Sequence, residues 1–476
     1  MPIFAQKVRA WMVVSAAAFM LLAWPMTGIA AADNGRPQAK PEERAAALIR
    51  PSVMYLAAES AALVRLPDGE ILSQFGRGSS IPFLATWRCT AFVVNPDGWV
   101  ATAGHCVDPE SAKVLLLKRA ANEYRIQFPD APESREPAVA FEWLQKNARV
   151  EGDTPDHGPH VGVTVMSGTG TKLTEKLSAT VVDFRPLAKG DAALLKVAKR
   201  NLPSSELDTD ADVTVGTPIL AVGFPASTQN VTGPSLDPTN KSGKVSKKSV
   251  MGSSPEYEID AAMTDGMSGG PAIGLNGKVI GVNSFAPAGE TQAFNFISPA
   301  EGLAAILAGK GVKATLGPAD LSYRKGLSHY YAGRYTDAIA DFDQTLGMSP
   351  GYPGLDDVRT SAFNLRQQYG DTSPSGGKAR LWYILVSAVS VVSLASVLAY
   401  VAVKRRRRSP AYAAASGGTS AGTGAAQPLR LVPSRRPAAN EPHFCANCGS
   451  EHHPAERFCP NCGQRINRSD RRGKPA

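Results

Sequence analysis

Most of this chain lacks an excess of charge of either sign. The 476 residues include 51 Lys and Arg against 42 Asp and Glu. From Lys404 to the end there are 14 basic and 4 acidic residues, which leaves 37 and 38 in the rest of the chain. Proteins that bind nucleic acid present a basic surface. The near-neutral body therefore excludes nucleic-acid binding as its default function.

Cysteine is also scarce, and its six copies fall into two groups. Cys89 and Cys106 form a widely spaced pair, whereas the other four form two C-x2-C pairs: Cys445, Cys448, Cys459 and Cys462. The first pattern suggests a disulfide and the second a metal site. Because these chemistries prefer opposite redox compartments, we expect a membrane between them.

Long apolar runs occur at only two places in the sequence. Residues 1–32 combine Lys7 and Arg9, an apolar run and small residues before Asp33, which predicts a secretory signal peptide. An uncleaved anchor is the alternative. Residues 381–403 contain no charge and are followed by five cations. A helix of this length spans about 34 Å, so we predict a single transmembrane helix with a cytoplasmic C-terminal side, the alternative being a buried core helix.

Between these runs, residues 45–316 contain many short strand-like segments. They are separated by turn residues and include Thr90–Val94, Ala192–Val197, Thr217–Val222 and Lys278–Val282. This pattern predicts an all-β barrel or sandwich. Residues 120–176 show weaker periodicity, and we expect this stretch to include a long surface loop around residues 151–160. Its acidic and histidine residues suggest a cation site only weakly, because no fixed ligand spacing is met; they are Asp153, Asp156, His157 and His160.

Residues 318–370 change to a helical pattern. Small and aromatic residues have the offsets of a tetratricopeptide-type hairpin, in which Gly326 allows close helix approach and Phe342 fills the gap. A plain helical hairpin is the alternative. One repeat buries too little to stand alone, so it should pack on the β domain or on the helix at 355–369. Residues 404–440 read as a basic and flexible linker.

Three ordered segments carry the chemistry. Thr102–Cys106, Gly190–Leu195 and Gly266–Pro271 supply His105, Asp191 and Ser268. A serine hydroxyl needs an imidazole to take its proton, and the imidazole needs a carboxylate to hold its tautomer. Glycines beside the serine would let the N–H groups of Gly266 and Ser268 point at one spot as an oxyanion hole.

These segments resemble the trypsin-like serine proteases of the chymotrypsin clan, especially bacterial HtrA-type domains. Phe92–Gly98 and Ile280–Asn283 are also similar, and the resemblance covers about residues 45–316. It implies a mainly β fold of two six-stranded barrels with the triad between them, and peptide-bond hydrolysis through an acyl-enzyme without a cofactor. It further implies a disulfide between Cys89 and Cys106, and a bacterial origin.

Two departures from this family are informative. Met267 stands where trypsin-like zymogens carry the aspartate that pairs with a new N-terminus, so that route of activation is not expected. Ala262 occupies the position that sets the charge of the specificity pocket, to which we also assign Ser284. An uncharged pocket favours small or medium apolar residues before the scissile bond over Lys or Arg.

The two C-x2-C pairs, separated by ten residues, predict a zinc ribbon at 441–467. Four thiolates at this spacing can close a tetrahedral structural Zn²⁺ site. The flanking arginines allow contact with acidic partners, although a solvated tail is the alternative. The zinc ribbon would offer a surface for a cytoplasmic protein partner.

The sequence therefore predicts a membrane-anchored serine endopeptidase facing outside the cytoplasm, with protein or peptide substrates. The alternative is a latent or inactive receptor or scaffold with the same fold, which signals across the membrane to the zinc ribbon. A nucleic-acid binder would need stacking aromatics, and the tail offers only Phe444 and Phe458. Nucleic acid is therefore not an expected partner.

Overall fold

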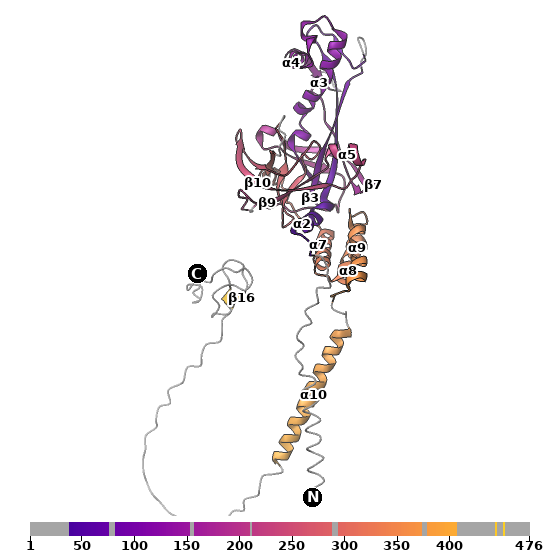
Figure 1. Cartoon of the computed structure of the whole chain (residues 1–476), viewed down its shortest axis with the longest axis vertical. Coiled ribbons are helices and arrows are strands. Elements are labelled where there is room, and N and C mark those ends of the chain that lie inside the picture. Colours follow the sequence, from indigo (N-terminus) through magenta and orange to yellow (C-terminus); the bar gives the residue numbers. More distant parts are fainter. Residues whose placement is uncertain are drawn as a thin grey trace, which may run out of the picture. The chain divides into compact units, whose positions relative to one another are not determined.

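The computed structural model describes residues 38–75, 81–152, 157–209, 212–287, 294–373, 378–406, 443–444 and 451–452. The chain divides into two compact units, Met1–Val386 and Ser387–Ala476. The first unit contains two sets of antiparallel strands, with helices packed on them (Figure 1). The expected signal peptide at 1–32 and the four cysteines of the expected zinc ribbon lie outside the described residues.

The first set of strands closes on itself. Its order is β1-β3-β4-β8-β7-β6, and β1 pairs again with β6; the bounds are β1 (Val53–Arg65), β3 (Phe83–Asn95), β4 (Trp99–Thr102), β6 (Gly162–Thr169), β7 (Lys172–Arg185) and β8 (Ala192–Val197). Every second residue of β1 from Leu56 to Val64 is buried, as the two-residue period of a strand requires. Two short strands, β2 (Ile71–Leu72) and β5 (Arg149–Glu151), pair with the far end of β1.

The second set is a closed barrel of six strands. Its order is β10-β11-β14-β13-β12-β9, with the bounds β9 (Pro218–Gly223), β10 (Thr239–Met251), β11 (Ser254–Ile259), β12 (Pro271–Gly274), β13 (Val279–Asn283) and β14 (Asn295–Pro299). The short helices α5 (Ala226–Thr232) and α6 (Ala300–Gly309) follow β9 and β14. The prediction of a mainly β fold with a closed six-stranded barrel is confirmed, and the four strand-like segments lie in or overlap β3, β8, β9 and β13.

Within residues 120–176, where the sequence periodicity is weak, the structure has helices and strands on both sides of the predicted loop at 151–160, and residues 153–156 of that loop lie outside the described residues. Two helices, α3 (Pro109–Gln127) and α4 (Pro137–Asn147), precede β5, β6 and β7. The helices pack on the extended ends of β1 and β3 (Figure 1), where Leu116, Leu117 and Leu144 are buried against Val64 and Phe83. This separate apolar cluster explains why the segment is ordered as helix.

At the other end of the strands, the helices α7 (Pro318–Tyr331), α8 (Tyr335–Met348) and α9 (Leu355–Tyr369) form a further cluster with α2 (Pro41–Ile49) (Figure 1). A Cβ on Gly326 would lie 2.5 Å from the Phe342 ring, so the predicted close approach of the first two helices is present. Asp320 is buried and joins this cluster to the β domain, because it accepts hydrogen bonds from Ser204 N and Oγ. The hairpin thus packs both on α9 and on the β domain.

The predicted membrane segment 381–403 lies in helix α10 (Lys378–Arg406). Among the helices in the described ranges, none is long and apolar enough to cross a membrane. In the second unit, two short strands, β15 (His443–Phe444) and β16 (Glu451–His452), pair antiparallel.

Candidate active site

The histidine of the predicted triad lies in a short 3-10 turn, Gly104–Cys106, directly after β4. The turn must begin with glycine, because a Cβ at Gly104 would come within 1.8 Å of the Arg185 carbonyl oxygen. His105 keeps about a quarter of its side chain exposed, at 27%. The fold therefore holds the imidazole at a fixed place while one side remains open to a ligand.

Asp191 directly precedes β8 and has no exposed surface. Its carboxylate accepts hydrogen bonds from His105 Nδ1 at 2.8 Å and from the His105 backbone N at 2.8 Å, and the Ser284 hydroxyl is a further donor. Asp191 has a positive φ of 32°, and Gly190 before it has a φ of 104°. Aspartate is one of the few residues that tolerate this region, so the turn can present the carboxylate to the histidine.

The charges of this pair are mutually stabilising. Burial acts to lower the pKa of His105, but the hydrogen bond and negative charge of Asp191 outweigh it and raise that pKa. Burial acts to raise the pKa of Asp191, yet the hydrogen bonds from His105 and Ser284 lower it overall. An ionised carboxylate on Nδ1 fixes the tautomer that leaves Nε2 as a proton acceptor.

Ser268 lies in a turn between the second barrel and the first ring of strands. Gly266 and Gly269 on either side have φ of 94° and 83°, which L residues with side chains rarely adopt. Thr90 of β3 clamps the turn, because its hydroxyl donates to the Gly266 carbonyl at 2.7 Å and its backbone N donates to the Ser268 carbonyl at 2.8 Å. In the described part of the chain, no group accepts a hydrogen bond from the backbone N–H of Gly266 or Ser268.

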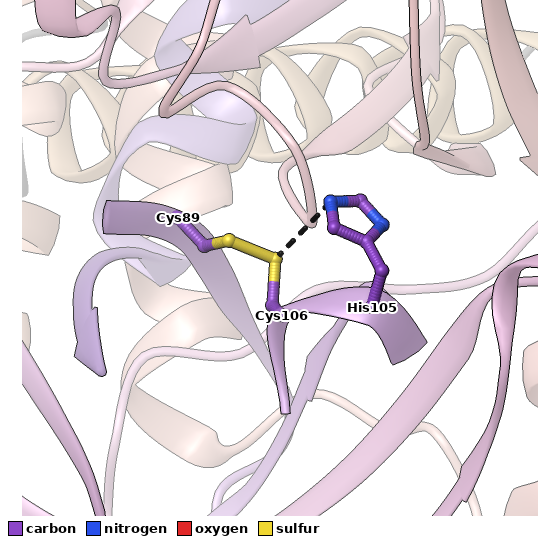
Figure 2. A group of neighbouring side chains, drawn as sticks. All are labelled: Cys89, His105 and Cys106. Carbon is purple, nitrogen blue, oxygen red and sulfur yellow. Dashed lines mark hydrogen bonds between the residues drawn. A yellow bond between two sulfur atoms is a disulfide. The ribbon is translucent and has the colours of Figure 1, made fainter. Parts of the chain in front are cut away.

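Cys89 of β3 and Cys106 beside the histidine form a disulfide, with an S–S distance of 1.99 Å. Their sulfurs lie next to the imidazole, and Nε2 of His105 is 3.8 Å from Sγ of Cys106 (Figure 2). This trio is the one metal-like cluster within the described ranges, but disulfide sulfurs are not thiolate ligands. The close packing therefore acts to hold the histidine loop on β3.

His105 and Ser268 line one cavity of about 610 Å³. Among the described residues no hydrogen bond joins the Ser268 hydroxyl to the His105 ring, so the structure shows the carboxylate–imidazole half of the triad formed. Catalytic hydrogen bonds are often loose in ligand-free proteins and tighten when substrate is bound. The structure thus brings all three predicted residues to one site.

The two residues predicted for the specificity pocket, Ala262 and Ser284, do not line this cavity, and Ala262 is exposed. Ser284 is buried and donates to Asp191, which assigns it a place behind the triad. The sequence did not predict that Thr90 holds the Ser268 turn. The one feature that could have indicated it is a hydroxyl residue directly after the half-cystine Cys89. Of the suggested cation loop, Asp153 and Asp156 lie outside the described residues.

Comparison with known proteins finds similar peptidases. The sequence profile of the trypsin-like peptidase domain matches residues 89–282. Serine protease HTRA1B of Danio rerio is 35% identical over 149 residues, which cover 31% of this chain and 29% of that protein. A probable periplasmic serine endoprotease of DegP-like type from Bartonella henselae is 36% identical over 143 residues, covering 29% and 26%. The chain thus spans less than a third of these relatives.

Two solved structures are also similar. The serine endoprotease from Yersinia pestis has 17% identity and a TM-score of 0.33, covering 58% of this chain and 67% of that one. A protease from M. tuberculosis in its active form has 20% identity and a TM-score of 0.33, covering 57% and 86%. Together, the profile and the curated relatives identify a trypsin-like peptidase domain of the serine-endopeptidase type in this chain.

Proposed function

We propose that this chain is a serine endopeptidase in which Ser268 is the nucleophile, His105 the general base and Asp191 the residue that holds the histidine. The observation that carries the proposal is the buried Asp191 carboxylate, bonded to both Nδ1 and the backbone N of His105 at 2.8 Å, at a cavity that also contains Ser268. The match to the trypsin-like peptidase domain supports the same assignment.

In this mechanism Ser268 Oγ attacks the carbonyl carbon of the substrate, and its proton moves to Nε2 of His105. When the peptide C–N bond breaks, the same proton passes to the leaving amine, and the acyl group stays on Oγ as an ester. Water then attacks the ester with His105 as base again, releasing the acid and restoring the serine. Asp191 remains ionised throughout and stabilises the imidazolium.

The carbonyl oxygen becomes negatively charged in the tetrahedral intermediate. The N–H groups of Gly266 and Ser268 would donate to it, because they have no acceptor within the described residues. Gly266 is needed for this arrangement, since a Cβ there would come within 2.4 Å of the Phe224 carbonyl oxygen. Removing one such donor typically costs about 100- to 1,000-fold in turnover. We keep Ala262 as the proposed determinant against cleavage after Lys or Arg.

The test is covalent labelling of the full-length protein with a fluorophosphonate, which reacts with activated serines. We expect labelling of the wild type and none of Ser268→Ala. Ser246→Ala is the matched control, because Ser246 is an exposed serine on β10 and should label like the wild type. Labelling that persists in Ser268→Ala would overturn the assignment. No labelling of folded wild type would favour the latent receptor with this fold.

We also propose a single-pass arrangement with the peptidase domain outside the cytoplasm and residues 404–476 inside. Its support is the sequence: the leader at 1–32, the uncharged segment 381–403 and the cations after it. Protease digestion of intact cells, with an antibody to each end, tests it. Loss of the peptidase domain with survival of the C-terminal tail is expected, and survival of both would contradict it.

The four cysteines of residues 441–467 would hold a structural zinc ion. The pairing of β15 with β16 supports this proposal, because the residues that pair, His443–Phe444 and Glu451–His452, flank Cys445 and Cys448 in the sequence. Zinc content of the full chain, measured by atomic emission, should be about one ion per chain and should fall in Cys445→Ser and Cys459→Ser. Unchanged zinc in both variants would refute it.

A further inference from the structure

The cavity of about 610 Å³ at His105 and Ser268 extends well beyond these residues, and its volume lies within the range of about 300–1,000 Å³ for ligand pockets. One wall comes from β3, one from helix α3 and one from the second barrel. The lining residues other than the triad are Thr86, Trp87, Arg88, Cys89, Ser111, Val114, Leu115, Ala226, Asp265 and Gly266.

Helix α3 has two different faces. Ser111, Val114 and Leu115 have the spacing of i, i+3 and i+4, which puts them on one side of the helix, and all three line the cavity half-buried. Leu116 and Leu117 lie toward the opposite side and are buried against β1 and β3. The helix is thus fixed by its buried face while it presents an apolar face to the active-site cavity.

The N-terminal end of helix α3, which lies nearest the triad, is held in place by several contacts. Asp108 caps the helix, accepting a hydrogen bond from Glu110 N at 3.0 Å, only two residues after the half-cystine Cys106. The disulfide ties Cys106 to β3. On β3, the indole of Trp87 donates to the Cys106 carbonyl at 2.9 Å. Trp87 and the start of α3 are therefore held in fixed positions beside His105.

The position of the imidazole indicates which part of a substrate would enter. The leaving amine must receive its proton from Nε2 of His105, so the leaving segment departs on the Nε2 side. Nε2 faces the Cys89–Cys106 disulfide (Figure 2), and Cys89 lines the cavity that continues to Trp87 and α3. The leaving segment would therefore cross the disulfide and enter between β3 and α3.

We propose, on the basis of the function above, that this cavity binds the leaving-group side of the substrate. Trp87, Val114 and Leu115 select an apolar side chain within the first residues after the scissile bond. The inserted helix pair α3–α4 is thereby a specificity element of the peptidase, and the acyl side of the substrate does not contact it.

The test is a competition for the acyl-enzyme of the full-length protein. A small ester substrate loads Ser268, and an added amino-acid amide competes with water. The amine nitrogen attacks the acyl carbon, Oγ of Ser268 leaves and regains a proton through His105, and a new peptide bond forms. An amide that binds in the cavity captures more of the acyl group, so the ratio of capture by leucinamide to capture by glycinamide measures apolar selection.

We expect this ratio to be well above one in the wild type and to fall about tenfold in Leu115→Ala, because a few methylene groups in an apolar pocket discriminate by about 10- to 200-fold. Leu115→Trp should fill the cavity and lower capture of leucinamide by a similar factor. Ile126→Ala is the matched control. Ile126 is an apolar residue of the same helix, is 72% exposed and does not line the cavity, so the ratio should stay unchanged.

The fluorophosphonate separates the possible failures. Absence of labelling in the wild type would refute the proposed function itself. Equal labelling of all variants with an unchanged capture ratio in both Leu115→Ala and Leu115→Trp would overturn this inference and leave the peptidase intact. Should either variant fold poorly, Ser111→Trp at the other end of the same helix face tests the point again, with the same expected loss of leucinamide capture.

Discussion

Two buried carboxyl groups of the peptidase domain behave in opposite ways. Asp191, directly before β8, is 0% exposed, and Glu256, on β11 of the second barrel, is 1% exposed. The pKa of Asp191 lies below its usual value, whereas burial raises the pKa of Glu256 from 4.5 to about 7. Burial is common to both, so their hydrogen-bond partners must decide the difference.

The partners differ in number and charge. Asp191 receives the ring and backbone N–H groups of His105 and the hydroxyl of Ser284. Glu256 has the Ser298 hydroxyl at 3.2 Å from either oxygen, and the negative charge of Asp191 raises its pKa further. A buried carboxylate is ionised where donors and a cationic partner surround it, and is protonated where they are few. The comparison distinguishes a carboxylate that its donors keep ionised from one that is merely buried.

The largest effect should follow from neutralising the charged member of this pair. Asp191→Asn should lower kcat/KM by about 10⁴-fold, because an amide no longer fixes the histidine tautomer or stabilises its protonated form. The acid limb of the pH profile should also move to lower pH, since the charge that raises the pKa of His105 is gone. Steady-state kinetics of the full chain across pH measure both changes.

Asp183→Asn serves as the control for this variant. Asp183 is an aspartate of β7 whose side chain is 43% exposed and paired with Lys310, so its loss should leave kcat/KM close to the wild-type value. Activity of Asp191→Asn within tenfold of the wild type would contradict the role assigned to Asp191.

The next largest effect concerns the turn that contains Ser268. Gly269 has a φ of 83°, and a Cβ there would lie 2.1 Å from Thr102 Oγ1 and 2.3 Å from the Thr90 carbonyl oxygen. Gly269→Ala should therefore lower the free energy of unfolding by about 4 kcal/mol, from backbone strain and the clash together. Urea unfolding of the full chain measures it.

Gly311→Ala isolates the strain from the clash. Gly311 has a φ of 67° but no heavy atom within 4 Å of an added Cβ, so only about 1 kcal/mol should be lost. Equal destabilisation by the two substitutions would mean that the close contact of Gly269 with Thr90 and Thr102 adds nothing to the cost of backbone strain.

The features that could be predicted from the sequence depend on residues that lie close together in the chain. The turn around Ser268 was predictable because its glycines lie within a few residues of the serine, and Gly326 with Phe342 has a repeat-like spacing. Helix α3 was missed because both of its faces carry apolar residues, which blurs the helical period, and its partners Val64 and Phe83 lie in distant strands.

The polar partners were missed for a similar reason. Ser284 meets Asp191 across 93 residues, and Ser298 meets Glu256 across 42 residues, so only strand pairing brings them together. No local pattern distinguishes these serines from others. The sequence could therefore predict that Asp191 and His105 lie together, and could not predict the serine hydroxyls that bond to Asp191 and Glu256.

The smallest effect tests the second carboxyl group by its pH dependence. Because the pKa of Glu256 is raised from 4.5 to about 7, the folded state binds a proton that the unfolded state has released in this window. Its contribution to stability is present below about pH 4.5 and is lost as pH rises toward 7. This loss is at most about 3 kcal/mol. Glu256→Gln should remove this loss of stability with rising pH. Urea unfolding midpoints of wild type and variant, measured at about pH 5 and pH 8, would show the difference.

Glu258→Gln, on the same strand but less buried, is the control and should keep the wild-type pH dependence. Two other groups of the site titrate outside or beside this window. Because the pKa of Asp191 is lowered in the fold, its contribution to stability is lost only as pH falls below the usual pKa of an aspartate. Because the pKa of His105 is raised, its contribution to stability is lost as pH rises above about 6.5. A slope that remains in Glu256→Gln only above about pH 6.5 would thus belong to His105. An unchanged slope from pH 5 upward would show that Glu256 is ionised in the fold, and that the contrast with Asp191 is wrong.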